Sequence, residues 1–522
     1  MTKPARALFA TALFVAICRV PLEAGNSVSR YGAVGDGIHD DTRAIQQAID
    51  RQPRGAVLDF GAGDKVYMIS RQLVLKPEVH YAGAAIIRMS RNAPVGTQIA
   101  VLRYGSANNV SIDGLTFDSN GVGGGIAIDV LGGADTPAMN LSIHGVTFRN
   151  TLAPARGAYD AAIYDPVGLM NGTIADNKFI HCGSGVSLGN ADHVRIAGNR
   201  FEDISSGDAI FVTFSPNAGW AGHGLEISSN TGTHLGRMAI EVWAEQPTNA
   251  DGVLVRDNSF DTWNPDVRGN GFGISIMTGR RAVVVNNNLR GVASGMAFGL
   301  EMGAPGSIVE GNRVEGFSLG IALHRGNGTR LTNNQLIHQE EAGIQITNAP
   351  GSKADLLIQG NTIVDAKRAG IWSNSEQWSG SQVLDNSITR AAGAFPDDSH
   401  IAFVGIATTP PLQPVTITGN TVVQSAPVPV RGFSFTGIQV NGGAGANAGS
   451  QCRANTVKSA SRSPFGAGLL VNAPGSADGV VLEGNHFEGL ASVIAGAPSP
   501  RIVLRGNTAL NCASRGTVVS HL

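Results

Sequence analysis

An asparagine recurs along most of this 522-residue chain, each time inside a short apolar stretch such as RIAGNRF, VLVRDNSF, LIQGNTI or VVLEGNHF. The thirteen asparagines are Asn177, Asn199, Asn230, Asn258, Asn287, Asn312, Asn334, Asn361, Asn386, Asn420, Asn455, Asn485 and Asn507. They define 12 intervals over 330 residues, which gives a mean period of 27.5 residues. Two earlier stretches, SIDGLTF and SIHGVTF, carry an apolar residue in place of the asparagine. A fixed period of this length indicates a repeat architecture.

A second element recurs between the asparagines, in forms such as SGVSLG, DAIFVT, MAIEVW, FGISIM, LGIALH, AGIQIT and AGIWSN. These are short alternating stretches that predict strands, so each unit holds at least two strands and no crossover helix. We therefore expect an all-β solenoid, a stack of coils about 4.8 Å apart over residues 110–512. The competing propeller fold needs about 40 residues per blade. Asparagine suits the repeated turn because it tolerates the left-handed conformation and can form a ladder between coils.

Composition bounds the kinds of partner. A net charge of −2 and a pI near 6.6 give no electrostatic reason to expect a nucleic acid partner or a membrane surface. The 42% of hydrophobic residues favours a packed core over disorder. After the N-terminus no apolar run is long enough to span a bilayer, so we expect no membrane insertion.

The first 24 residues resemble a secretory signal, with the basic residues Lys3 and Arg6 followed by the apolar core ALFATALFVAIC. This predicts a secreted or periplasmic protein whose mature part, residues 25–522, is a single solenoid domain. Cys18 ends the apolar core and raises a lipid anchor as an alternative, although the preceding isoleucine is too large for a good lipidation site.

Three cysteines remain after such a cleavage, namely Cys182, Cys452 and Cys512. An odd number of widely spaced cysteines is not a disulfide framework, and the sequence leaves open whether Cys452 pairs with Cys512. Their spacing does not match a metal site. We expect no cofactor. The sequence has no dense aspartate cluster of the kind that holds Ca²⁺, but a bound Ca²⁺ ion is left open as an alternative.

The stretch YGAVGDGIHDDTRAIQQAID predicts one helix over residues 38–51. Asp40 or Asp41 can cap its N-terminus, and its apolar face consists of Ala44, Ile45, Ala48 and Ile49. A solenoid exposes an apolar core and strand edges at its end, and we interpret this helix as the cap that covers them.

Together with QLVLKPEVHYAG, this stretch resembles the N-terminal signature of the pectate-lyase-like superfamily. The resemblance implies a right-handed parallel β-helix, in a group of mostly secreted proteins that act on or bind polysaccharides. Side-by-side homotrimers occur among such solenoids, and the sequence leaves the assembly open. GDAIFV and GHGLEI match the polygalacturonase motifs only in part, because one aspartate stands where that family has two. The polygalacturonase site is therefore not transferred, nor is activity on pectin.

Aligning the second element predicts which residues face outward on successive coils. Val186, Ile210, Ile240, Ile274, Leu300, Ile321, Ile344 and Ile371 are taken as inward, which makes Ser187, Phe211, Glu241, Ser275, Glu301, Ala322, Gln345 and Trp372 outward. Glu241 and Glu301 then lie two coils apart on one face. Side chains at that spacing can reach the separation of about 6.5–9.5 Å that an inverting glycosidase needs.

The candidate catalytic residues are therefore Glu241, Glu301, Asp208, His223 and His324. The candidate substrate-binding residues are Trp220 and Trp243 as stacking platforms, Arg325 as a partner for an acidic sugar, and Tyr164. Tyr164, with Tyr159 and Asp160, is also a candidate for the base of a lyase. Each of these side chains has a structural or solvated alternative role, and Trp372 could pack under a loop.

Two classes of function follow. The first is a secreted enzyme that cleaves a polysaccharide, in which two carboxylates favour hydrolysis over β-elimination, with uronate epimerisation as a further alternative. The second is a non-catalytic, glycan-binding or tailspike-like solenoid, which would bind without turnover.

Overall fold

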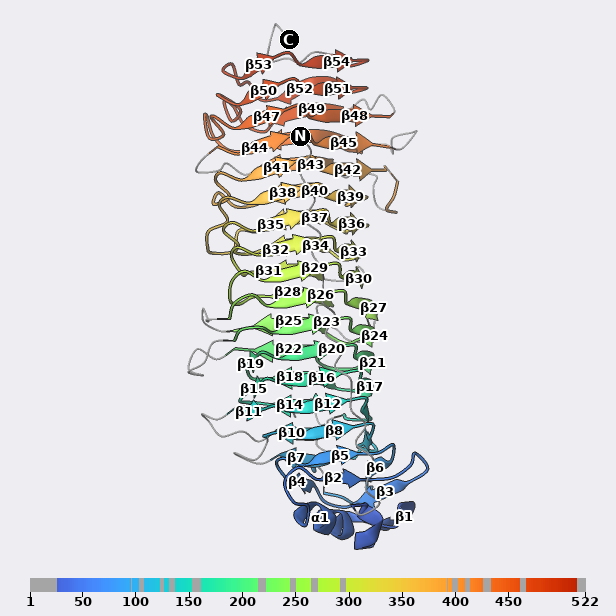
Figure 1. Ribbon diagram of the computed structural model, residues 1–522. Coiled ribbons are helices and arrows are strands. Elements are labelled where there is room, and N and C mark those ends of the chain that lie inside the picture. The colour runs from blue at the N-terminus through green and yellow to red at the C-terminus, as the bar shows by residue number, and fades with distance from the viewer. Residues whose placement is uncertain are drawn as a thin grey trace, which may run out of the picture.

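The chain winds into a stack of coils, a parallel β-helix (Figure 1). The computed structural model describes residues 26–94, 96–102, 108–122, 126–130, 137–152, 161–214, 222–244, 250–263, 271–291, 297–391, 393–396, 402–408, 414–425, 433–460 and 466–513. A typical coil places β23 (Glu226–Ser228) in sheet 1, β24 (Thr231–Leu235) in sheet 2 and β25 (Met238–Trp243) in sheet 3. The sequence predicted at least two strands per coil. The structure has three, because each asparagine stretch forms a strand on either side of its turn.

Sheet 3 carries the outward residues that were aligned from the sequence. Its sixteen strands are β4 (Leu73–Leu75), β7 (Ala100–Leu102), β10 (Ile128–Val130), β14 (Ala161–Asp165), β18 (Ser184–Leu188), β22 (Ile210–Thr213), β25 (Met238–Trp243), β28 (Phe272–Ile276), β31 (Phe298–Met302), β34 (Leu319–Leu323), β37 (Ala342–Ile346), β40 (Ala369–Ser373), β43 (Ala402–Thr408), β46 (Ser434–Val440), β49 (Gly466–Val471) and β52 (Ser492–Gly496).

Sheets 1 and 2 flank the asparagine turns. Sheet 1 comprises β2 (Val57–Asp59), β5 (His80–Ala82), β8 (Ser111–Asp113), β12 (Ser142–His144), β16 (Thr173–Ala175), β20 (Arg195–Ala197), β23, β26 (Leu254–Arg256), β29 (Val283–Val285), β32 (Ile308–Glu310), β35 (Arg330–Thr332), β38 (Leu357–Gln359), β41 (Gln382–Leu384), β44 (Thr416–Thr418), β47 (Gln451–Arg453), β50 (Val481–Glu483) and β53 (Val503–Arg505). Sheet 2 comprises β1 (Asp36–Asp40), β3 (Val66–Ile69), β6 (Ile86–Met89), β9 (Thr116–Asp118), β13 (Thr147–Arg149), β17 (Lys178–Cys182), β21 (Arg200–Ile204), β24, β27 (Ser259–Trp263), β30 (Asn288–Arg290), β33 (Arg313–Glu315), β36 (Gln335–Ile337), β39 (Thr362–Val364), β42 (Ser387–Arg390), β45 (Thr421–Gln424), β48 (Thr456–Ser459), β51 (His486–Glu488) and β54 (Thr508–Leu510). A small sheet of β11 (Ala138–Met139), β15 (Leu169–Met170) and β19 (Ala191–Asp192) lies beside them.

The thirteen asparagines form one continuous ladder, as the sequence predicted. From Asn177 to Asn485, each Nδ2 donates to the Oδ1 of the asparagine on the next coil at 2.8–3.0 Å. The same Oδ1 accepts the backbone N–H of the preceding asparagine, for example that of Asn258 on Asn287 at 3.0 Å. At the N-terminal end the backbone N–H of Val146 donates to Asn177 Oδ1 at 2.9 Å, in the unit where valine replaces asparagine.

One part of the asparagine argument was wrong. The left-handed residue of each turn is the one before the ladder asparagine, for example Asp176 (φ 56°), Gly198 (φ 67°) and Asp257 (φ 57°). The ladder asparagines are not among the left-handed residues, and all of them except Asn507 are buried. Their amides are selected for hydrogen bonding between coils, and the preceding residue supplies the turn.

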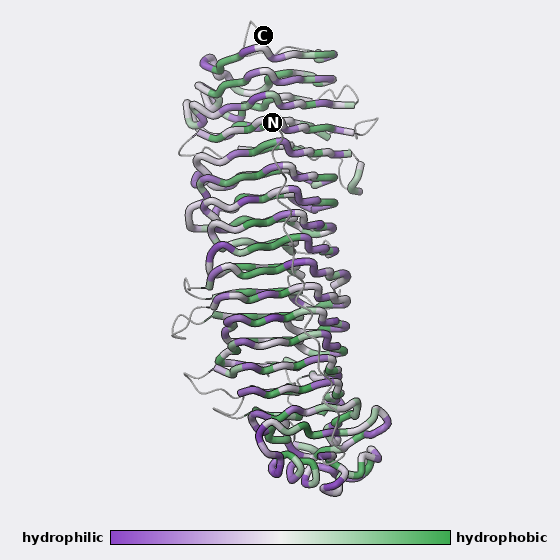
Figure 2. Tube along the Cα trace, viewed as in Figure 1, coloured by the Kyte–Doolittle hydropathy of each residue, from purple (hydrophilic) through white to green (hydrophobic). Residues whose placement is uncertain are grey.

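Apolar side chains fill the interior of the stack from one coil to the next. Figure 2 shows hydrophobic and hydrophilic segments alternating along each coil. Inside sheet 2, Phe117, Phe148, Phe179 and Phe201 stack with ring centroids 5.7, 5.1 and 4.7 Å apart. The core is therefore continuous along the axis, as a solenoid requires.

The predicted helix covers the N-terminal end of this core. It is α1 (Thr42–Asp50), preceded by the 3₁₀ turn η1 (Val28–Tyr31) and by β1 (Asp36–Asp40). It is shorter than the expected range of 38–51, because residues 36–40 form a strand that pairs with β3. Ile45, Ala48 and Ile49 are fully buried, and Ala44 packs against them as expected.

The two aspartates before α1 have different roles. Asp40 Oδ1 accepts the N–H of Thr42 at 3.0 Å and so takes the capping role. Asp41 makes no cap bond, because its carboxylate accepts the N–H groups of Val34 and Gly35 at 2.7 and 3.1 Å. Asp41 therefore ties the glycine-rich turn to the helix.

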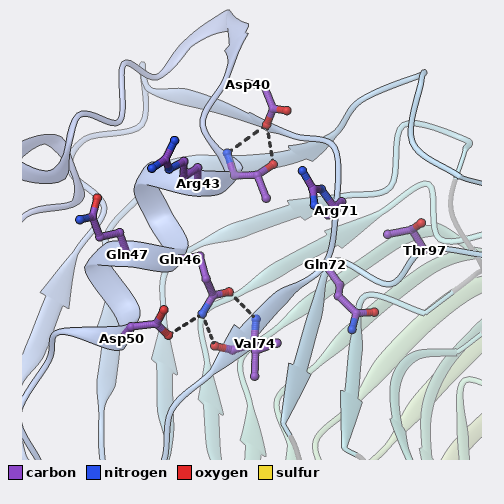
Figure 3. Close-up of a pocket in the computed structure, with 10 residues that line it drawn as sticks. Asp40, Arg43, Gln46, Gln47, Asp50, Arg71, Gln72, Val74 and Thr97 are labelled. Atoms are coloured by element: carbon purple, nitrogen blue, oxygen red, sulfur yellow. Dashed lines mark hydrogen bonds between the residues drawn. The ribbon is translucent and has the colours of Figure 1, made fainter.

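A cavity of about 840 Å³ lies between α1 and the start of sheet 3 (Figure 3). Gln46 reaches across it, accepting the N–H of Val74 at 2.8 Å and donating to its carbonyl at 3.0 Å. The glutamine thus pairs with the free edge of β4 as another strand would. We interpret this cavity as the junction between cap and solenoid, because Gln46 spans it from the helix to β4.

The expectations for the N-terminal segment cannot be compared with the structure, whereas those for the three later cysteines can. Residues 1–24, including Cys18, lie outside the described residues. Cys182, Cys452 and Cys512 are all free thiols, so Cys452 and Cys512 do not pair. Within the described part of the chain no helix has the length and apolar character needed to cross a membrane.

The ladder predicts a position-dependent stability loss. Asn287→Ala removes the acceptor of two buried donors, Asn258 N–H and Nδ2, at a cost of about 3 kcal/mol. Asn507→Ala removes the same two bonds at the end of the ladder, where they are only partly buried and water can replace them. Thermal unfolding and hydrogen exchange should show a large effect for the first variant and a small one for the second. Equal effects would contradict a structural role for the buried ladder.

Candidate active site on sheet 3

The strand register of sheet 3 places three polar residues in one outward row. Glu241 on β25 pairs with Ser275 on β28, which pairs with Glu301 on β31. This confirms the alignment made from the sequence. With neighbouring strands about 4.8 Å apart, the backbones of Glu241 and Glu301 are about 9.6 Å apart.

Asp208, Arg237 and Glu241 form the first half of the site. Arg237 Nη1 lies 2.7 Å from Asp208 Oδ2 and 2.8 Å from Glu241 Oε2. Asp208 Oδ1 also accepts the N–H of Met238 at 3.1 Å. Asp208 and Arg237 each stand just before a strand, β22 and β25, so the parallel pairing of these strands brings them together.

This half of the site holds two buried carboxyl groups and one cation. Asp208 is 4% exposed and Glu241 is 7% exposed. Burial raises the pKa of Asp208 to about 8; Arg237 lowers it, and the negative charge of Glu241 raises it again. The pair therefore retains one proton at neutral pH, since a single guanidinium cannot balance two buried negative charges.

Ser275, Glu301 and His324 form the second half. Ser275 Oγ donates to Glu301 Oε2 at 2.6 Å, and His324 Nε2 lies 3.0 Å from Glu301 Oε1. The histidine contact is short but lacks the alignment of a good hydrogen bond, so we treat it as mainly electrostatic. His324 Nδ1 is 3.0 Å from Thr347 Oγ1, which orients the ring.

The pKa of Glu301 is shifted in the opposite direction to that of Asp208. Burial by itself raises the pKa of Glu301, but the contacts with His324 and Ser275 outweigh burial and leave that pKa below its usual value. The site thus places a proton-holding carboxyl pair two coils away from an ionised carboxylate. Divergent pKa values of this kind distinguish an acid from a base.

Aromatic side chains border the row. Trp243 follows Glu241 by two residues on the same strand and is 37% exposed, so its ring is available for stacking. Phe298 lies beside His324 with ring centroids 5.9 Å apart. Trp372 is partly buried against a cluster that includes Ala322, Ala342 and Ala369 on sheet 3 strands, whereas the alternative considered for it was packing under a loop.

Two other described candidates, His223 and Tyr164, lie away from this cluster. His223 is exposed and forms an isolated bridge with Asp251 in the turn before sheet 1. Tyr164 occupies the same row, but Ser187 and Phe211 separate it from Glu241. Trp220, Tyr159 and Asp160 lie outside the described residues. Arg325 follows His324 and lines a neighbouring cavity.

Arg237 is the residue that sequence reasoning missed. A signal was available, because the aligned positions on neighbouring coils are occupied by Gly207, Gly271 and Ala297. A charged residue in a column of small ones, four positions before Glu241, indicates a side chain that reaches along the sheet surface. Asp129, which precedes Tyr164 in the row, was also missed.

The described residues contain no group of three or more histidine, cysteine, aspartate or glutamate side chains that could hold a metal ion. The groups that the described cluster presents are carboxyl groups, one guanidinium and one imidazole.

Comparison with known proteins establishes the family. The sequence profile described as "right handed beta helix region" matches residues 99–289 and 248–422, more than half of the chain. The chain belongs to this family of right-handed β-helices. A second profile, "Rhamnogalacturonase A/epimerase, pectate lyase-like", matches residues 26–99, the part that carries the cap.

Individual relatives are distant. The plasmin and fibronectin-binding protein A of Streptococcus pneumoniae is 24% identical over 358 residues, which cover 65% of this chain and 44% of that protein. The chain thus spans less than half the length of this relative. The A-module of mannuronan C-5 epimerase AlgE6 from Azotobacter vinelandii matches with 15% identity, coverage of 92% and 98%, and a TM-score of 0.38. The GH87 α-1,3-glucanase catalytic unit from Streptomyces thermodiastaticus matches with 15% identity and a TM-score of 0.31. The match covers 93% of this chain and 69% of that one. Similarity this low says nothing of the substrate.

The raised pKa of Asp208 predicts a pH-dependent stability. Its folded value of about 8 exceeds the ordinary value of 3.8, so its contribution is complete below pH 4 and is lost as pH rises towards 8. Asp208→Asn keeps the shape but removes the titration. The difference in thermal midpoint between variant and wild type should therefore shift in favour of the variant as pH rises from 4 to 8. A difference that is constant with pH would contradict the assignment of the proton.

Proposed function

We propose that this protein is an exported enzyme that hydrolyses a polysaccharide at the outer face of sheet 3. The observation that carries the proposal is a pair of opposite pKa shifts at one face of sheet 3: the pKa is raised at Asp208, which Arg237 links to Glu241, and lowered at Glu301, two coils from Glu241. A glycosidase needs one protonated and one ionised carboxyl group on either side of the scissile bond. Export is part of the proposal, because polysaccharide polymers of this kind lie outside cells.

The proposed mechanism gives each half of the site one role. The Asp208–Glu241 pair donates its proton to the glycosidic oxygen as the bond from that oxygen to the anomeric carbon breaks. Glu301 takes a proton from a water molecule whose oxygen bonds to the same carbon. Arg237 holds the acid pair in place, and Ser275 and His324 keep Glu301 ionised. Backbones about 9.6 Å apart allow the two carboxyl groups to adopt the wider separation of an inverting enzyme, so inversion is part of the proposal.

Elimination and epimerisation are less well supported by the described residues. Burial, together with the charges of Asp129 and Asp165, raises the pKa of Tyr164, which makes this tyrosine a poor base. Both chemistries also need a cation for the carboxylate of a uronate. Arg237 is already in contact with Asp208 and Glu241, so it is not available for that task.

A non-catalytic binding solenoid is the second candidate. The streptococcal relative is named for binding plasmin and fibronectin, and this supports a surface-binding role for a chain of this fold. The two candidates differ in whether a bound polymer is cleaved.

Removing the base should abolish turnover and preserve binding. Glu301→Gln keeps the size of the side chain and the acceptor for Ser275, and we expect hydrolysis to fall by about 10²–10⁴-fold. New reducing ends, without the ultraviolet absorbance of an unsaturated uronate, are the readout on a panel of polysaccharides. Glu310→Gln, an exposed glutamate on sheet 1 of the next coil, is the matched control. Binding without new reducing ends in the wild-type chain would instead support the second candidate.

The rate should follow the two carboxyl groups over pH. The alkaline limb should lie near pH 8, because the acid pair loses its proton as pH rises through the pKa of Asp208. The acid limb should lie below the ordinary pKa of a glutamate, because Glu301 must remain ionised. Initial rates on the best substrate from pH 3 to 10 measure both limbs. A rate that keeps rising above pH 9 would rule out the acid pair as proton donor.

A further inference from the structure

A cavity of about 340 Å³ lies directly beyond the candidate site, at the carboxyl ends of the sheet 3 strands. Its described lining includes Met277, Gly303, Arg325 and Gly351. Met277 follows Ser275 by two residues and Gly303 follows Glu301 by two residues. The wall of the cavity is therefore a continuation of the strands that carry the row, and its volume is in the range of small-ligand pockets.

Two glycines let Met277 and Arg325 pack closely against the wall of this cavity. A Cβ added at Gly303 would lie 2.9 Å from Met277 Sδ, and one added at Gly351 would lie 2.9 Å from Arg325 Cγ. A larger residue at either position would displace its neighbour, so the present positions of Met277 and Arg325 depend on these glycines.

Arg325 is the one charged side chain among the lining residues. It is exposed, and the structure pairs it with no carboxylate among the described residues. Behind the wall, Lys353 is fully buried and donates to the carbonyls of Ala349 and Gly351 at 2.5 and 3.0 Å. Burial, and then the charge of Arg325, lowers the pKa of Lys353, which indicates that the two cations share one region. Among the described residues, the cavity thus has a positive wall without an anion.

We propose that this cavity is a subsite for an acidic group on a sugar next to the one being cleaved, so that the substrate is an acidic heteropolysaccharide with a neutral sugar at the scissile bond. This deepens the proposed function and rests on it. The row itself has no free cation among the described residues, because Arg237 is engaged by two carboxylates. A polymer with a carboxylate on every sugar would place one against Glu241 and Glu301, which disfavours it. Arg325 offers a planar donor group suited to a carboxylate or a sulfate.

Binding to matched polymers tests this assignment without turnover. The mature chain carrying Glu301→Gln is titrated with chondroitin and xanthan, which carry a carboxylate on some sugars, and with chondroitin 4-sulfate, polygalacturonate and dextran. We expect chondroitin or xanthan to bind at least tenfold more tightly than polygalacturonate and dextran. When the carboxyl groups of the tightest-binding polymer are chemically reduced to alcohols, its affinity should fall about tenfold. A gain from chondroitin to chondroitin 4-sulfate would identify sulfate as the preferred anion.

Substitution of Arg325 separates the subsite from the rest of the groove. Arg325→Gln keeps the stem that packs on Gly351. It should lower the affinity for the acidic polymer by about the same tenfold and leave the affinity for the carboxyl-reduced polymer unchanged. Arg325→Lys should lose less, and the binding of the parent should weaken with salt while that of Arg325→Gln does not. Arg290→Ala, an exposed arginine on sheet 2, should leave affinity unchanged.

Results that contradict the subsite can be told apart from results that contradict the proposed function. Tightest binding to dextran or polygalacturonate, or an Arg325→Gln variant with unaltered affinity for the acidic polymer, overturns the subsite and leaves hydrolysis standing. A chain that binds none of these polymers contradicts the proposed function as well.

Discussion

Hydrogen bonding from each coil to the next is the constraint on which the rest of this structure depends. Every strand in the stack finds its partner about 28 residues away in the sequence, and the buried asparagine ladder fixes that register at the turn between sheets 1 and 2. An asparagine that accepts two donors from one neighbour and donates to the other cannot slip by one residue without leaving buried amides unpaired. The interior can then be filled by apolar side chains of many shapes.

The same register creates the candidate site. Residues separated by tens of positions, such as Glu241 and Glu301, become neighbours on one face because their strands are held in step. The outer face of a sheet is a flat and well-hydrated place for a carboxylate. Here the bends before β22 and β25 add Asp208 and Arg237 to the surface, and the resulting contacts bury the carboxyl groups. Burial raises the pKa of Asp208, whereas the contacts with Ser275 and His324 lower the pKa of Glu301. Two carboxyl groups that would otherwise be alike therefore differ in proton affinity.

Much of the fold was predictable from the sequence, because it depends on periodicity. The inward column from Val186 to Ile371 follows directly from the alternation of apolar residues, and the cap follows from one amphipathic stretch. The third strand per coil was not resolved, because two short strands around a turn look like one apolar run. The site was only partly predictable. Glu241 and Glu301 occupy aligned positions, whereas Arg237 acts through the reach of a long side chain, which the alignment does not describe. His223 was a candidate for acid/base work, but it lies in a turn away from the cluster.

The central claim is that one proton resides on the Asp208–Glu241 pair while Glu301 is ionised. Neutron diffraction from a deuterated crystal near pH 7 tests it most directly, since it locates hydrogen at each carboxyl oxygen. The account predicts one deuteron shared by Asp208 and Glu241 and none on Glu301. A deuteron on Glu301, or none on either member of the pair, would contradict it.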